Sequence, residues 1–231
     1  MSHILNSGYT SFGSWLSAMN GGSPNQKHIQ FRNETSCITA AYEAHFKRFK
    51  PEKFKTENFR EIEVSCTTEV KGKDIVRIYN NTAYVDLYFD ESNYFQASNR
   101  KKKELALEIL QAGVTKVAKQ FYWELDPFIY AYEKIKEHDY RYVFTYGKRK
   151  HSPNRKFIAE IVCEHDIDFF DIYIMIRDKS GTKIKMEKVR SEENERILVL
   201  KPIGQIKWIA NDSVILTNGF PGEEKEVKLQ E

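Results

Sequence analysis

The sequence predicts an α+β fold in which antiparallel β-meanders flank a central helical pair. Apolar residues recur at three- and four-residue steps through residues 100–122, which is the spacing of a helix with one buried face. In much of the chain on either side they alternate with polar residues, as in half-buried strands. Short turns join these strand-like segments, which favours antiparallel pairing over long parallel crossovers.

The composition indicates a globular, cytoplasmic protein. The chain has 231 residues, 41% of them hydrophobic, which is enough for a large core. Its net charge of +3 does not by itself indicate a nucleic-acid partner. The three cysteines include no C-x-x-C pair, no run reaches the roughly 18 apolar residues of a membrane span, and the first residues lack the order of a secretory signal. We therefore expect no membrane partner and no cofactor.

The first third of the chain is expected to hold an arm, a helix and a sheet. Residues 1–27 are rich in Ser, Gly and Asn, which is typical of an N-terminal arm. A short helix is predicted from Ser36 to Phe49, before the helix-breaking Pro51. From Phe59 to Asp90 the apolar period is two, which predicts a three-stranded antiparallel meander.

Two helices are predicted in the middle of the chain. The first runs from Arg100 to Tyr122, and the second begins at Asp126 and Pro127, because Asp can cap a first turn and Pro fits its first position. The buried face of the first helix is formed by Leu107, Leu110, Val114, Val117 and Phe121. The basic residues 100–103 begin this helix, where its partial positive charge disfavours cations. We interpret them as a solvated, frayed turn, or alternatively as a contact for phosphate or an acidic partner.

The remainder of the chain is predicted to be nearly all strand. The expected strands are residues 140–146, 157–164, 169–177, 183–189, 197–200, 205–209, 213–217 and 225–229. Residues 28–231 are expected to form a single α+β domain, or two lobes at 28–138 and 139–231.

The outer face of the first meander is the leading candidate for a binding site. Its members are acids and tyrosines at alternate positions: Glu61, Glu63, Glu69, Tyr84, Asp86, Tyr88 and Asp90. Tyrosine contributes contact area at interfaces, and acids steer a basic partner. This pattern predicts a non-catalytic protein that binds another protein with a basic surface, such as an inhibitor or a toxin-immunity protein. The alternative is that this face is solvated, or covered by the chain's own helices.

A cationic segment supports a second hypothesis, a nucleic-acid-binding accessory protein. It consists of Lys148, Arg149, Lys150, Arg155 and Lys156 on a predicted hairpin tip, where cations suit phosphate contacts. The simpler interpretation is a charged loop that keeps an edge hairpin soluble.

A third hypothesis is a metal-dependent hydrolase. Its carboxylates and imidazole are Glu160, Glu164, His165, Asp166, Asp168 and Asp171, of which Glu164, His165, Asp166 and Asp168 are weak metal-ligand candidates. Acids are also common at turns, where they bond the local backbone. The sequence has no G-x-S-x-G, phosphate-binding loop, G-x-G-x-x-G or H-E-x-x-H motif. We assign no catalytic residue, and an enzyme is not the favoured class.

Overall fold

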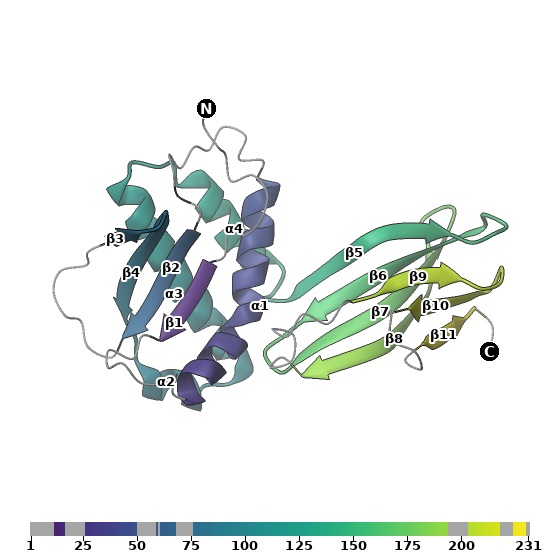
Figure 1. The fold of residues 1–231 in the computed structure, drawn as a ribbon, viewed down its shortest axis with the longest axis horizontal. Coiled ribbons are helices and arrows are strands. Elements are labelled where there is room, and N and C mark those ends of the chain that lie inside the picture. The colour runs from purple at the N-terminus through teal and green to yellow at the C-terminus, as the bar shows by residue number, and fades with distance from the viewer. Residues whose placement is uncertain are drawn as a thin grey trace. The chain divides into compact units, whose positions relative to one another are not determined.

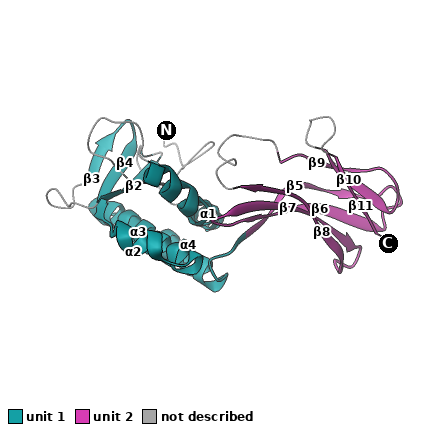
Figure 2. Ribbon diagram, turned by 90° about the horizontal axis from the view of Figure 1, so that it is seen from below, with its two compact units in different colours: residues 1–142 teal, residues 143–231 magenta. Residues whose placement is uncertain are grey.

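The computed structural model describes residues 12–16, 26–49, 59, 61–67, 76–193, 203–217 and 224–229. The chain divides into two compact units, Met1–Tyr142 and Val143–Glu231 (Figure 2). Helices and largely antiparallel sheets confirm the predicted α+β class. The predicted strand at 197–200 and the acid Glu69 lie outside the described residues.

Unit 1 contains a mixed four-stranded sheet in the order β1-β2-β4-β3. The strands are β1 (Phe12–Leu16), β2 (Glu61–Thr67), β3 (Val76–Tyr79) and β4 (Thr82–Tyr88). The β3–β4 hairpin is antiparallel as predicted, and its turn residues Asn80 and Asn81 have φ values of 48° and 64°, which asparagine tolerates. The predicted antiparallel pairing of β2 is wrong, because β2 lies parallel to both β1 and β4. Alternation of apolar residues identifies the buried face of a strand but not its neighbour.

The helices of unit 1 are α1 (Gln26–Arg48), α2 (Glu91–Gln96), α3 (Asn99–Gln120) and α4 (Asp126–Glu137). Helix α1 begins ten residues before the predicted start at Ser36, because its first half buries the polar side chains of Asn33 and Thr35 and so lacks an apolar stripe. Thr35 satisfies its hydroxyl by donating to the carbonyl of Phe31. Asp126 does not cap α4 as predicted, since Leu125 holds the N-cap position without a side-chain bond.

Helix α3 packs on one face of this sheet (Figure 1). Leu107, Leu110, Val114 and Val117 are buried, as the sequence predicts, and Gly113 lies against Val64 of β2. Five further residues of β2 and β4 on this face are buried too: Ile62, Cys66, Ala83, Val85 and Leu87. The acids and tyrosines that alternate with them therefore point away from α3.

Unit 2 consists of two sheets that share one core. The first has the order β5-β6-β7-β8, with β5 (Tyr142–His151), β6 (Phe157–His165), β7 (Phe169–Asp178) and β8 (Lys183–Glu193). The second has the order β11-β10-β9, with β9 (Gln205–Trp208), β10 (Ser213–Thr217) and β11 (Lys225–Lys228). Buried residues of β6 and β7 form one apolar cluster with Ile206, Val214, Leu216 and Val227 of the second sheet.

Candidate binding surfaces

The register of unit 1 gathers the predicted acids and tyrosines on one side of the sheet. Glu63 lies opposite Tyr84, and Thr67 lies opposite Tyr88. Arg77 and Tyr79 of β3 share this side, because Arg77 pairs with Tyr84 and Tyr79 with Thr82. We call the set formed by Glu61, Glu63, Arg77, Tyr79, Tyr84, Asp86 and Tyr88 the acidic face. Tyr79 is 67% exposed and Tyr88 63%, so both rings are available for contact.

Arg77, on the edge strand β3, is the basic residue of the acidic face. Its guanidinium donates to both carboxylate oxygens of Asp86, at 2.9 and 2.7 Å. Burial, together with the negative charges of Glu61 and Asp86, raises the pKa of Glu63 to about 7, although Arg77 acts in the opposite direction. The neighbouring carboxylates thus affect the pKa of Glu63 more than Arg77 does. An added cation would favour ionisation of Glu63.

Asp90, which the sequence predicts as part of the binding face, also has a structural role. Asp90 is the N-cap of α2, and its carboxylate accepts a hydrogen bond from the backbone N–H of Asn93 at 3.1 Å. This bond satisfies an amide that the first turn of a helix leaves unpaired. Capping of α2 is therefore a structural reason for an aspartate at position 90.

The protonation of Glu63 predicts a pH-dependent stability. Its pKa is higher in the folded chain than in the unfolded chain, so its contribution is complete below about pH 4 and is lost as pH rises through about 7. Glu63→Gln should remove this dependence and stabilise the protein by about 1 kcal/mol at pH 8, less than the full shift implies because water reaches the half-buried carboxyl. Urea unfolding at several pH values measures it. Equal pH profiles for variant and wild type would contradict the prediction.

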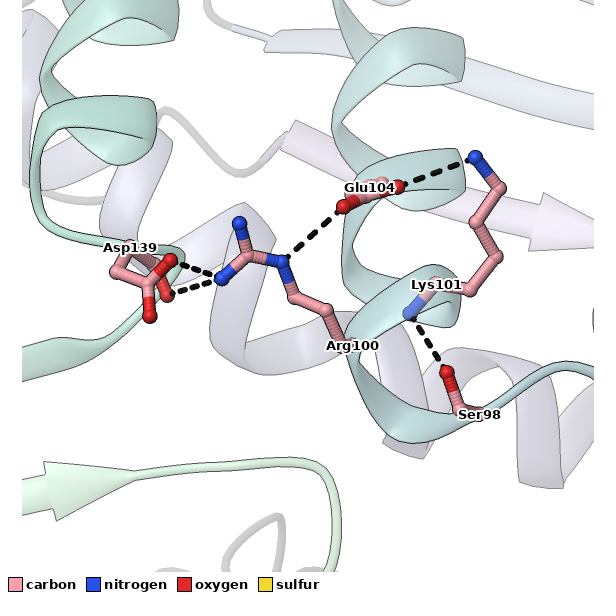
Figure 3. Close-up of polar contacts among 5 residues, drawn as sticks. All are labelled: Ser98, Arg100, Lys101, Glu104 and Asp139. Carbon is pink, nitrogen blue, oxygen red and sulfur yellow. Dashed lines mark hydrogen bonds and ion pairs between the residues drawn. The ribbon is translucent and has the colours of Figure 1, made fainter.

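The basic residues that begin α3 belong to a folded helix terminus (Figure 3). Ser98 caps the helix by accepting from the backbone N–H of Lys101, and Arg100 pairs with both Glu104 and Asp139. The Arg100 guanidinium also lies 4.2 Å from the centre of the Tyr140 ring. Lys101 pairs with Glu104 at 3.1 Å, and Lys102 and Lys103 are buried. The interpretation of these residues as a solvated, frayed turn is therefore wrong, and acids of the chain itself satisfy the cations of Arg100 and Lys101.

The cationic segment comprises the end of β5, which continues to His151 beyond the predicted strand end at 146, and the loop before β6, and all five predicted side chains are exposed. We call residues 148–156 the basic hairpin. Arg149 lies 3.9 Å from Glu160. The other four cations form no ion pair with any residue that the structure describes: Lys148, Lys150, Arg155 and Lys156.

Hydrogen bonds hold the tip of the basic hairpin in shape. The Ser152 hydroxyl donates to the Asn154 side chain at 2.8 Å and accepts from the backbone N–H of Phe157 at 3.0 Å. Trp208 donates its ring N–H to the carbonyl of Lys150, and the Asn211 side chain accepts from the backbone N–H of Asn154. The backbone that carries the cations is thus fixed from both sheets of unit 2.

The predicted metal ligands are not brought together as a site. The described ranges contain no group of three or more His, Cys, Asp and Glu side chains that could hold an ion. Asp166 accepts from the backbone N–H of Ile167, and His165 is buried with its ring 5.4 Å from that of Phe170. Glu164 and Asp168 belong to the same strand end and turn.

Asp171 has a structural role on unit 2. It is buried and accepts hydrogen bonds from Lys188, Ser191 and Tyr173. Burial disfavours its charge, but these three donors hold the pKa of Asp171 below its usual value.

The cysteines are also buried, and burial raises the pKa of Cys66 and Cys163 to about 12, which makes both thiols poor nucleophiles at neutral pH.

Comparison of the chain with protein-family models, curated proteins and solved structures finds no match. In the part of the chain that the structure describes, no helix combines the length and apolar character needed to span a membrane. The fold and the surfaces thus define an α+β protein of two units, with an acidic face on unit 1 and a basic hairpin on unit 2.

Proposed function

We propose that this protein is a non-catalytic, cytoplasmic binding protein that captures a partner with a basic surface on the acidic face of unit 1. A toxin inhibitor or toxin-immunity protein is the role that fits this chemistry. The observation that carries the proposal is the gathering of three carboxylates, Glu61, Glu63 and Asp86, with one cation, Arg77, on one side of the sheet.

Two further features of the acidic face support a protein partner. The face lies on the side of the sheet away from α3, and its two most exposed tyrosines, Tyr79 and Tyr88, flank the carboxylates on neighbouring strands. Tyrosine is enriched at interfaces because its rigid ring contributes area while its hydroxyl remains solvated. A lysine or arginine from the partner would also displace the proton of Glu63, so binding should strengthen as pH rises from 6 to 8.

Removing the charge of the acidic face tests this proposal. The variant is Glu61→Gln, Glu63→Gln and Asp86→Asn, which leaves the Asp90 cap of α2 intact. The partner is isolated by crosslinking in cells, purified, and titrated against both proteins. We expect the variant to bind at least about tenfold more weakly and to lose the pH dependence.

The matched control removes three exposed acids elsewhere in unit 1: Glu124→Gln, Asp126→Asn and Glu133→Gln. It changes the net charge equally and should bind within about twofold of wild type. Equal binding by the acidic-face variant would overturn the proposal, as would a partner whose contact surface is not basic.

A second candidate function is supported by the four cations of the basic hairpin that have no ion-pair partner among the described residues. We propose that this hairpin contacts phosphate groups, as in a nucleic-acid-binding accessory protein. About four such contacts give a log-log slope of affinity against salt near −3 to −4. A gel-shift titration tests it, and the absence of any shift at low salt would end this candidate.

A further inference from the structure

The register of unit 2 places a second hairpin tip beside the basic hairpin. Phe157, at the start of β6, pairs with Asp178, at the end of β7, and Arg177 pairs with Lys183, at the start of β8. The loops at 152–156 and 179–182 therefore lie at the same end of the four-stranded sheet (Figure 1). Because neighbouring strands are about 4.8 Å apart, the centres of the two hairpins are about 10 Å apart.

The second tip is also cationic. Lys179 and Lys183 are exposed and form no ion pair with the residues that the structure describes. The one acid of this loop, Asp178, accepts hydrogen bonds from the Ser180 hydroxyl and from the backbone N–H of Thr182, and these bonds hold its pKa below the usual value. The Asp178 carboxylate thus accepts hydrogen bonds from its own loop, while Lys179 and Lys183 are exposed to solvent.

Glu160 joins the two hairpins across β6. Its carboxylate lies 3.9 Å from Arg149 of β5 and 3.6 Å from Arg177 of β7. Arg177 in turn donates to the carbonyl of Gly181 at 3.0 Å, which holds the second loop closed. Glu160 thus contacts an arginine of each hairpin, while the lysines of both tips have no such acid beside them among the described residues.

The opposite end of the same sheet is acidic. Phe169 pairs with Glu193 and Phe170 with Glu192, so these two acids lie at the end that also carries Glu164, Asp166 and Asp168. This end thus carries more acids than the end with the two tips, although Arg190 pairs with Glu192 there. The cations of the two tips form a local field of one sign although the whole chain carries only +3.

We propose that the two tips form one cationic end of the sheet, the basic end, that binds the phosphate backbone of a nucleic-acid duplex. It consists of Lys148, Lys150, Arg155, Lys156, Lys179 and Lys183. This inference rests on the second candidate function and adds a second hairpin to it. A duplex carries one charge per about 1.7 Å of its axis with both strands counted, and only part of these charges face one side. The long side chains of the tips therefore have to extend the contact beyond the roughly 10 Å between the hairpins for six cations to meet six phosphates.

Nucleic acid is favoured over a membrane surface by the composition of the tips. Among described residues, positions 148–156 and 177–183 include no exposed large hydrophobic side chain, and the two beside them, Tyr146 and Ile184, are too few to anchor the tips in the acyl region. Contacts of this kind are made to the backbone and carry no base sequence information. The basic end should therefore bind duplexes of different sequence with equal affinity.

Neutralising the second tip separates this inference from the single-hairpin candidate. Wild type should bind a labelled DNA duplex with a log-log salt slope near −5, as expected for about six phosphate contacts. Lys179→Gln with Lys183→Gln should reduce the slope by about 2, and Lys119→Gln with Lys136→Gln in unit 1 should leave it unchanged. Fluorescence anisotropy between about 50 and 200 mM salt measures the slope.

The companion variant Lys148→Gln, Lys150→Gln and Lys156→Gln should reduce the slope by about 3. If this variant loses binding while the Lys179 and Lys183 variant equals wild type, the second tip is idle and this inference fails, whereas the single-hairpin function stands. No binding by wild type at low salt overturns both. Binding to phosphatidylserine vesicles but not to duplex also overturns this inference. Thermal unfolding of each variant checks that the fold is retained.

Discussion

Replacement of Lys102 by methionine is expected to lower the free energy of unfolding by about 3 kcal/mol or more. The Lys102 ammonium lies 2.8 Å from the Glu34 carboxylate, and the two side chains are only 9% and 12% exposed. It also lies 5.6 Å from the centre of the buried Tyr94 ring. Methionine fills similar space but removes the cation beside the buried Glu34 carboxylate, which keeps the hydrogen bond from the Gln30 amide. A buried charge without its counter-charge is among the costliest defects in a protein. Urea unfolding followed by circular dichroism measures the loss.

The neighbouring Lys101→Met is the matched control. Lys101 pairs with Glu104 at the surface, with its side chain 55% exposed, so its loss should cost less than about 1 kcal/mol. The double variant Glu34→Gln with Lys102→Met removes both charges and should recover most of the stability. A single Lys102 variant as stable as the Lys101 variant would show that the buried pair contributes nothing.

Gly113→Ala is expected to destabilise the protein by about 2 kcal/mol, although alanine in a helix interior normally stabilises by about 1 kcal/mol relative to glycine. A Cβ at this position would lie 2.7 Å from Cγ1 of Val64 and nearer still to Cγ2. Val64 is fully buried on β2, and its branched side chain has little rotamer freedom to move aside. Helix α3 would have to move away from the sheet, with loss of packing along its length.

The clash itself can be tested by giving the new methyl group space. In the presence of Val64→Ala, Gly113→Ala should cost much less than it does alone, because the methyl enters the space that Val64 leaves. Thermal or urea unfolding of the four proteins of this cycle gives the coupling. If Gly113→Ala raises stability, helix propensity outweighs packing and the close contact of α3 with β2 is not a constraint.

The parts of the fold that sequence predicted well are those governed by local rules. The stripe from Leu107 to Val117 identified α3 and its buried face, and Asn80 with Asn81 identified the turn between β3 and β4. The parallel pairing of β2 was missed because it depends on which strand lies beside which, and a period of two is the same for either direction. The first half of α1 was missed because it buries asparagine and threonine.

For the candidate sites too, local patterns were predictable from sequence, whereas features that depend on strand register and order were not. Alternation predicted which acids of β2 and β4 share a side of the sheet. The raised pKa of Glu63 depends on its burial and on charged neighbours, and only the folded structure supplies these. The position of Arg77 on the acidic face could have been predicted from sequence, because extending the β3–β4 hairpin from its turn pairs Arg77 with Tyr84. The two tips of the basic end lie more than twenty residues apart in sequence, and sheet order brings them together.

The difference in charge between the two ends of the four-stranded sheet of unit 2 has a consequence for how this unit meets other molecules. The ten residues of β7 extend over about 33 Å, whereas the electric field of an exposed charge decays within about 8 Å at physiological ionic strength. Each end of the strands thus acts on its surroundings as if the other were absent. In dilute salt the electric field reaches across the whole unit. A nearby polyanion would then orient unit 2, with its cationic end forward, before the first contact forms.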